Sequence, residues 1–263
     1  MSINIAVMVK VVHDLNMVVS CKSTKCIYSL PLAINDVDLS GLALACDLKN
    51  KFGGYVTIYS YIGQHLKDRL NEVELILRKL LALGADSAVL IVTNDTYPYS
   101  ESLVVKSLRN QLLNGVLPDL IICGEASIDS STSQICPRLA YALSTPYLPY
   151  VKSLDIDVDE KVIKAESFIG DEVITIRVKL PAVISVVKEI AKPKIPTLRE
   201  LIKAKRKPIH ITNITYKISK PLVTIKPVEV KREGKMYRDN LDDMVLKFIE
   251  IIKGVYRESP TSK

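Results

Sequence analysis

A short polar loop between an apolar run and a helical pattern holds the residues of this sequence whose types and spacing could do chemistry. The apolar run ends at Gly124, and acid, amide and hydroxyl residues follow it as far as Gln134. A strand, a polar loop and a helix start in this order present backbone N–H groups and hydroxyls to a phosphate. The pattern therefore indicates a nucleotide site, although the same residues could simply begin an ordinary capped helix.

The rest of the chain offers no obvious catalytic machinery. Its three histidines are scattered, and its five cysteines lack zinc-finger spacing, so we expect no metal site. An odd number of cysteines favours reduced thiols, although Cys21 and Cys26 could face each other in a hairpin. The N-terminus lacks the features of a signal peptide, and no apolar run reaches the ~18–20 residues of a membrane span. We therefore expect a cytoplasmic protein without direct membrane insertion.

Composition and charge narrow the function classes further. The 263 residues are 48% hydrophobic and contain no Trp, so packing must rest on aliphatic side chains, as in buried parallel strands. The formal net charge is +7, and residues 188–207 hold eight Lys or Arg against two Glu. This basic segment can be a solvated face, a protein-docking surface or a polyanion contact. It lacks interleaved aromatic residues, so we expect no nucleic-acid partner.

Strand and helix patterns alternate along the first 149 residues. Strands are predicted over residues 3–12, 55–61, 87–92 and 118–123, and helices over residues 37–49, 65–82, 97–113 and 134–144. This alternation predicts an α/β fold with a doubly wound, mostly parallel sheet. Ligands bind such sheets beyond the carboxyl ends of the strands. The polar loop lies at such an end.

The alternation of strand and helix patterns ends after Pro149. Four short β-branched segments, 151–156, 162–168, 173–179 and 182–187, predict antiparallel strands added to the sheet. Residues 211–236 predict an extended arm, and residues 241–256 predict a helix with one apolar face. That helix could pack on a partner or back on its own core. We therefore expect a nucleotide-binding core domain, 1–210, and a partner-contacting arm and helix, 211–263.

Several sequence blocks occur in an order and spacing that identify a family. They are Val9–Asp14, Asn35–Asp38, the Leu-Gly-Ala-Asp turn at 83–86, the loop 124–134, Leu180–Val183, Pro193–Leu198 and Ile202–Pro208. Together these blocks resemble the β subunit of electron transfer flavoproteins over residues 1–210. Residues 211–263 match the family only in general character.

The resemblance implies an adenine nucleotide alpha hydrolase-like fold and an electron carrier subunit that makes no bonds itself. The family's β subunit buries an adenine nucleotide, AMP in most members, and pairs with an α subunit that holds most of an FAD. The heterodimer takes electrons from flavin dehydrogenases, including acyl-CoA dehydrogenases, and commonly passes them to a quinone oxidoreductase. One alternative is a bifurcating member that holds a second FAD in place of AMP. Another is a stand-alone adenine-nucleotide-binding protein.

Carried over to this sequence, the resemblance predicts cofactor-binding residues at the ends of several strands. They are Met8, Lys10, Asn35, Tyr61, Gly63, Gly124, Ala126, Asp129, Ser130, Ser131, Thr132, Ser133 and Gln134. Tyr61 could stack on adenine or cover the core, and Asn35 could be a pure helix cap.

The phosphate loop departs from the family pattern, which usually reads aspartate-glycine-aspartate-threonine-glycine-glutamine. Here Ser130 and Ser133 replace the glycines, and Ser131 replaces the second aspartate. Loss of glycine raises the cost of any positive φ, whereas the new hydroxyls can donate to a phosphate. Nucleotide binding therefore stays compatible with the loop, but identical loop geometry is in doubt.

Residues 192–198 resemble the family's recognition loop, which docks into dehydrogenases through a leucine anchor. Leu198 occupies the anchor position, and Pro196 precedes it. An exposed apolar side chain among Lys and Arg suits a transient contact. The alternative is that Leu198 is the first core residue of a helix over 197–203. Leu15 stands where some members carry an aromatic residue near the flavin edge, and it offers only apolar contact.

Overall fold

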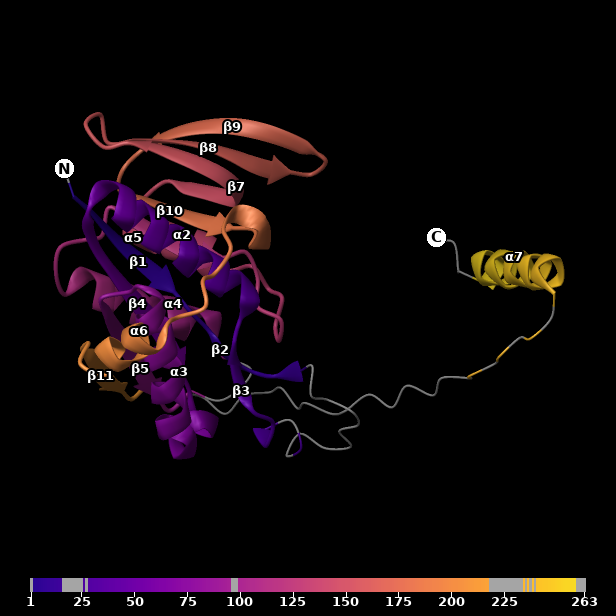
Figure 1. The fold of residues 1–263 in the computed structure, drawn as a ribbon, viewed down its shortest axis with the longest axis horizontal. Coiled ribbons are helices and arrows are strands. Elements are labelled where there is room, and N and C mark those ends of the chain that lie inside the picture. Colours follow the sequence, from indigo (N-terminus) through magenta and orange to yellow (C-terminus); the bar gives the residue numbers. More distant parts are fainter. Residues whose placement is uncertain are drawn as a thin grey trace. The chain divides into compact units, whose positions relative to one another are not determined.

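Nine strands form one sheet in the part of the chain that the computed structural model describes, which is residues 2–15, 26, 28–95, 99–217, 234, 236, 238 and 240–258. The sheet order is β11-β5-β4-β1-β6-β10-β7-β8-β9 (Figure 1). The strands are β1 (Ile3–Met8), β4 (Gly54–Ile62), β5 (Ser87–Thr93), β6 (Leu120–Gly124), β7 (Tyr147–Asp157), β8 (Val162–Ile169), β9 (Glu172–Lys179), β10 (Ala182–Val186) and β11 (Ile209–Ile214). From β11 to β7 all neighbours pair in parallel.

Helices cover both faces of this sheet. They are α2 (Asp36–Phe52), α3 (Leu70–Leu83), α4 (Glu101–Leu113), α5 (Ile135–Leu143) and α6 (Leu198–Ala204), with the 3-10 turns η2 (Gln64–Arg69) and η3 (Lys188–Ile190). Alternate residues of β1 point to opposite faces, so Ile5 packs with α2 and α3 whereas Met8 packs with α4 and α5. The predicted doubly wound, mostly parallel sheet is confirmed.

The chain reverses its direction of sheet growth beside β1. It passes from β1 to β4 and β5 on one side and then returns to place β6 on the other side. Such a reversal leaves a crevice beyond the carboxyl ends of the two central strands, where ligands bind in open α/β sheets. The polar loop 125–134 follows β6 directly, so the loop lies at this crevice.

Two strand predictions are wrong in detail. The strand expected over residues 3–12 stops at Met8, and β2 (Val11–His13) pairs instead with β3 (Leu32–Ile34) in a separate antiparallel sheet. The expectation that all four later strands are antiparallel also fails, because β10 pairs in parallel with both β6 and β7. Among the four later strands, the antiparallel pairs are β7–β8 and β8–β9. The strand β10 returns to insert between β6 and β7, which short turns in the sequence do not reveal.

The C-terminal region divides differently from the expected boundary. Contacts separate two compact units, residues 1–226 and residues 227–263. Residues 211–214 belong to β11, which pairs with β5, so the extended arm predicted from 211 is wrong for these four residues. Residues 218–233 of that arm lie outside the described residues. The helix predicted over 241–256 is present as α7 (Leu241–Glu258).

The structure bears on two further expectations, which concern the state of the cysteines and the absence of a membrane span. Cys46, Cys123 and Cys136 are free thiols, but Cys26 is disulfide-bonded, so the expectation of reduced thiols fails for Cys26. Sequence spacing alone does not show which sulfur atoms meet in space. Within the described residues, no helix has both the length and the apolar character that crossing a bilayer requires.

Candidate functional site

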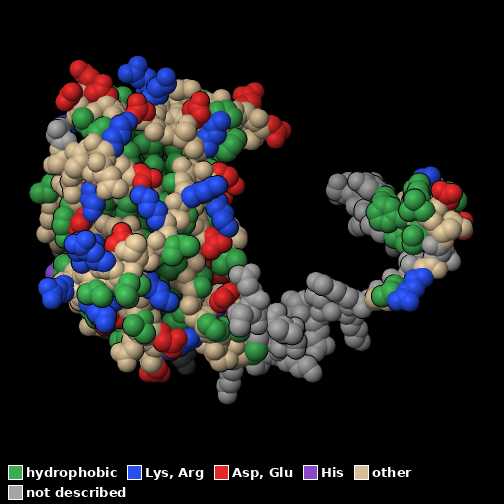
Figure 2. All heavy atoms as spheres, viewed as in Figure 1, with side chains coloured by type: hydrophobic (Ala, Val, Ile, Leu, Met, Phe, Trp, Pro, Cys, Tyr) green, Lys and Arg blue, Asp and Glu red, His purple; other side chains and the backbone are tan. Residues whose placement is uncertain are grey.

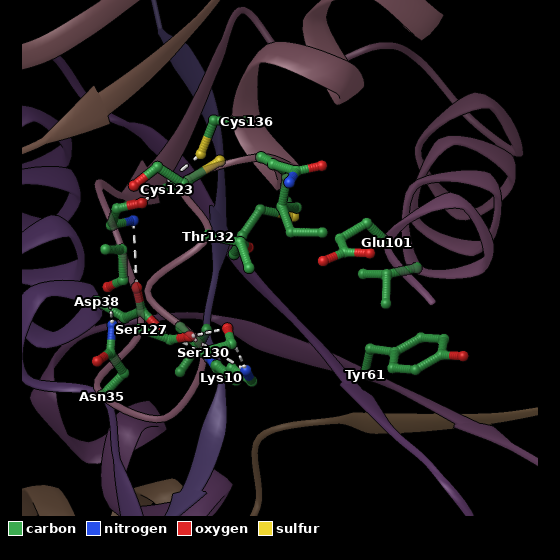
Figure 3. A pocket seen from close by; sticks show the side chains of 18 of the residues that line it. Lys10, Asn35, Asp38, Tyr61, Glu101, Cys123, Ser127, Ser130, Thr132 and Cys136 are labelled. Atoms are coloured by element: carbon green, nitrogen blue, oxygen red, sulfur yellow. Dashed lines mark hydrogen bonds between the residues drawn. The ribbon is translucent and has the colours of Figure 1, made fainter. Parts of the chain in front are cut away.

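A cavity of about 420 Å³ lies at the carboxyl ends of β1, β4 and β6. Its apolar lining is formed by Met8, Tyr59, Tyr61, Val104, Leu108, Cys123 and Cys136. Its polar lining is formed by Lys10, Asn35, Asp38, Ser127, Asp129, Ser130, Thr132, Ser133 and Gln134. Figure 3 shows labelled members of both sets around the same space. The volume and mixed lining are typical of small-molecule sites.

The buried carboxylate of Asp38, in the first turn of α2, joins the two central strands where they separate. Its Oδ2 accepts the Lys10 N–H at 2.8 Å, and its Oδ1 accepts the Gly124 N–H at 3.2 Å. The pairing of β1 with β6 extends only to Val7 and Ile122, so these N–H groups lie beyond it. A Cβ atom at position 124 would lie 2.3 Å from Asp38 Oδ1, and only glycine therefore fits there.

The ionisation of Asp38 is governed by two opposing effects. Burial raises the pKa of this carboxyl to about 7. Hydrogen bonds from the Lys10 N–H, the Asn35 side chain and the Gly124 N–H partly offset that rise. Asp38 therefore changes charge near neutral pH, and it does so at the edge of the cavity.

Asn35 fastens the polar loop to the start of α2. Its Nδ2 donates to the Ala126 carbonyl at 2.9 Å, and its Oδ1 accepts the Ile128 N–H at 3.1 Å. It occupies the N-cap position of α2, but its side chain makes no cap hydrogen bond. The alternative of a pure helix cap is therefore wrong, because the side-chain amide is used on the loop instead.

Lys10 fastens the same loop from the other side. Its Nζ forms an ion pair with Asp129 Oδ1 at 2.7 Å and donates to Ser127 Oγ at 3.1 Å and to Ser130 Oγ at 3.3 Å. The Ser127 and Ser130 hydroxyls are 2.8 Å apart. Ser127 was not among the predicted site residues, although its hydroxyl in the polar loop was a visible signal. These contacts leave one charge-balanced cluster at the rim of the cavity.

The final residues of the loop lead directly into α5. Ser131 and Ser133 adopt left-handed backbone conformations, with φ of 48° and 52°, whereas Ser130 does not. Of the two positions where the family usually has glycine, only 133 therefore carries backbone strain. The side chains of Thr132, Ser133 and Gln134 form no hydrogen bond within the described part of the chain. They and the first N–H groups of α5 therefore stay available to a ligand.

Tyr61 lines the cavity, whereas Gly63 has a structural role behind it. Tyr61 is only 6% exposed, its hydroxyl donates to Asp95 Oδ2 at 3.0 Å, and its ring meets Tyr99 edge to face. Tyr61 therefore serves as a fixed part of the cavity wall. Gly63 does not line the cavity: its N–H donates to the Tyr99 hydroxyl at 3.1 Å, and a Cβ there would meet the Asp95 carbonyl at 2.4 Å.

The structure also brings residues to the cavity that sequence reasoning missed. Ser131 was predicted and lies outside the lining, whereas Tyr99, Glu101 and Glu125 were not predicted and lie in it. Glu101 shares one helical face with Val104 and Leu108, at spacings of three and four residues. That periodicity was readable in the sequence, but which face of α4 meets the cavity was not.

The sequence of the chain is similar to those of several known proteins. Residues 28–215 match the family model described as "Electron transfer flavoprotein domain". "Electron transfer flavoprotein subunit beta" of Thermoanaerobacterium thermosaccharolyticum is 27% identical, over 94% of this chain and 96% of the relative. The protein of the same description in Bacillus subtilis is 30% identical, over 67% of this chain and 65% of the relative. "Caffeyl-CoA reductase-Etf complex subunit CarD" of Acetobacterium woodii is 27% identical, over 70% and 67%.

The Asp38 bridge predicts a pH-dependent loss of stability in Asp38→Asn. Both oxygens of the protonated carboxyl can still accept a hydrogen bond, whereas the NH2 group of an amide cannot, so the free energy of unfolding should fall by about 1–3 kcal/mol at pH 5. The folded-state pKa of about 7 lies above the unfolded value, so the stability from protonated Asp38 is lost as pH rises from about 4 through 7. The difference between wild type and variant should therefore shrink at pH 8. Urea unfolding at both pH values measures it, and a pH-independent difference would contradict the raised pKa.

The strained loop predicts that Ser133→Gly stabilises the protein. Glycine adopts a φ of 52° without a Cβ clash, so the free energy of unfolding should rise by about 0.5–1 kcal/mol. Ser130→Gly is the matched control, since Ser130 carries no such strain and its hydroxyl contacts Lys10. The control should be neutral or destabilised in thermal unfolding. Equal effects of both substitutions would show that backbone strain at 133 is not the cause.

Proposed function

We propose, since the chain belongs to the electron transfer flavoprotein family, that it is a β-type subunit whose cavity binds AMP and whose partner is a flavin-bearing α subunit. Subunits of this type are electron carriers and not enzymes. The heterodimer would take electrons from flavin dehydrogenases and pass them to an acceptor such as a quinone oxidoreductase. The observation that carries the proposal is the cavity at the β1–β6 reversal, whose lining combines apolar side chains with hydrogen-bond donors.

The apolar and the polar lining residues suit the two ends of AMP. The apolar wall around Met8 and Tyr61 would hold the adenine ring by burial. The hydroxyls of Thr132 and Ser133 and the first N–H groups of α5 would donate to the phosphate, where the helix dipole favours negative charge. Lys10 would add positive charge from the rim. FAD, held mostly by the α subunit, would supply the redox chemistry of the pair.

Nucleotide analysis of the purified complex tests this proposal. The chain is co-expressed with an α subunit of the family, the heterodimer is denatured, and the released nucleotides are quantified. One FAD and one AMP per heterodimer are expected. Two FAD would favour the bifurcating alternative, and a chain that is stable alone with bound AMP would favour the stand-alone alternative. Release of FAD alone would contradict a nucleotide in this chain.

We further propose that the start of α6 is a docking surface for electron donors. A capping box fixes this start: the Glu200 N–H donates to Thr197 Oγ1 at 3.3 Å, and Glu200 Oε2 accepts the Thr197 N–H at 2.6 Å. Leu198 is 74% exposed and Ile195 is 93% exposed, which argues against Leu198 as a core residue. Pro196 lies between them.

Basic side chains surround this apolar patch. Over α6, at the lower left, Figure 2 shows Lys and Arg side chains beside exposed hydrophobic ones. Lys194, Arg199 and Lys203 are nearest to Leu198 in the sequence, and Ile202 adds a further exposed apolar side chain. An apolar anchor that becomes buried gives affinity, while the surrounding charges steer the encounter with an acidic partner surface.

Replacement of the anchor predicts a specific kinetic defect. Leu198→Ala should raise the KM of a donor dehydrogenase for the heterodimer by about tenfold, because truncation of a buried interface anchor costs roughly 1–2 kcal/mol. Flavin content should stay unchanged. Val116→Ala is the matched control, since Val116 is also a highly exposed apolar residue and lies in the turn before β6. Unchanged donor kinetics in the Leu198 variant would remove the docking role.

A further inference from the structure

Glu101 brings an uncompensated carboxylate to the cavity. It is the first residue of α4, it is half-buried, and it lines the cavity. Figure 3 shows its side chain directed into the cavity, across from Lys10. Glu101 has no ion pair or hydrogen bond with any residue that the structure describes. Within the described part of the chain, no ion pair or hydrogen bond therefore accounts for this orientation.

The position of Glu101 along the cavity follows from the packing of α4 against α5. Arg138 in the first turns of α5 donates to Ser102 Oγ at 3.5 Å, so the beginnings of the two helices are adjacent. The beginning of α5 is also where Thr132, Ser133 and Gln134 offer their donors. Glu101 therefore borders the end of the cavity that would take a phosphate.

The charged residues around this end of the cavity disfavour an anion larger than a single phosphate. Among the described residues that line the cavity, Lys10 is the only Lys or Arg, and it is already paired with Asp129 at 2.7 Å. Glu101 and Glu125 add two carboxylates to the lining. A single phosphate can use the loop hydroxyls and the α5 N–H groups. A second phosphate would find no unpaired cation in the lining and would approach Glu101.

We propose that Glu101 makes the cavity selective for a nucleoside monophosphate over nucleotides with a diphosphate or longer chain. The inference rests on the proposed nucleotide site and adds the residue that sets its preference. Two like charges a few ångströms apart in a half-buried site repel strongly, because water screens them poorly there. The carboxylate therefore acts by excluding the wrong ligand rather than by binding the right one. The pyrophosphate of FAD falls in the excluded class.

Binding titrations of wild type and of the Glu101→Gln variant test this selectivity. The full-length chain, in complex with its α subunit and freed of its exchangeable nucleotide, is titrated with AMP, ADP, ATP and adenosine by calorimetry. In the variant, ADP and ATP should bind on the order of tenfold more tightly relative to AMP than they do in wild type, since one repulsive charge is gone. Adenosine, which carries no phosphate, should bind with the same affinity in both proteins.

A control separates ligand repulsion from helix stabilisation. An acid in the first turn of a helix also stabilises that helix through its dipole. Glu72 holds the same kind of position in α3 and does not line the cavity, so Glu72→Gln should leave the ratio of ADP to AMP affinity unchanged. Equal shifts in both variants would overturn the proposal.

Two other results would also overturn it, and they differ from failure of the nucleotide site itself. An unchanged ADP to AMP ratio in Glu101→Gln would show that the carboxylate does not sense the phosphate chain. Weaker adenosine binding in the variant would show that Glu101 accepts a hydrogen bond from the ribose or the base. If wild type binds none of the adenine nucleotides, the proposed function fails, whatever the variant does.

Discussion

The two hydrogen bonds that Asp38 accepts are the interaction on which the site depends. Parallel strands β1 and β6 satisfy each other's backbone groups only up to the point where they separate. Beyond that point the Lys10 and Gly124 N–H groups need an acceptor, because an unpaired buried N–H costs about as much as a lost hydrogen bond. One carboxylate from α2 supplies both acceptors. The strands can therefore diverge, and the crevice between them stays open without exposing unpaired backbone.

Some residues of the polar loop are held in place by other elements, and others keep their side chains available to a ligand. Asn35 and Lys10 hold the first half of the loop, residues 126–130, from two different elements. The second half, from Thr132 to Gln134, keeps its side chains uncommitted within the described residues. The rigid half fixes the position of the free half, so little order has to be gained when a ligand binds.

The cavity and the surface around α6 differ in the sign of their charged residues. The cavity lining holds Lys10 among four acidic residues, Asp38, Glu101, Glu125 and Asp129. The segment around α6, residues 188–207, instead carries eight Lys and Arg residues against two Glu. Acidic groups in the cavity limit how much anion it accepts, whereas basic groups on α6 favour an acidic protein surface. The net charge of +7 therefore says little about the nucleotide site.

The sequence by itself determined the alternation of strands and helices, because apolar periodicity and turn residues are local properties. It also determined that polar residues gather after β6, and the order of its blocks identified the family. Tertiary structure decided that β10 inserts between β6 and β7, that Asn35 binds the loop instead of capping α2, and that Glu101 enters the cavity. These outcomes depend on which residues meet across long stretches of chain. Such contacts are settled by burial and hydrogen bonding of the whole sheet, and no local pattern records them.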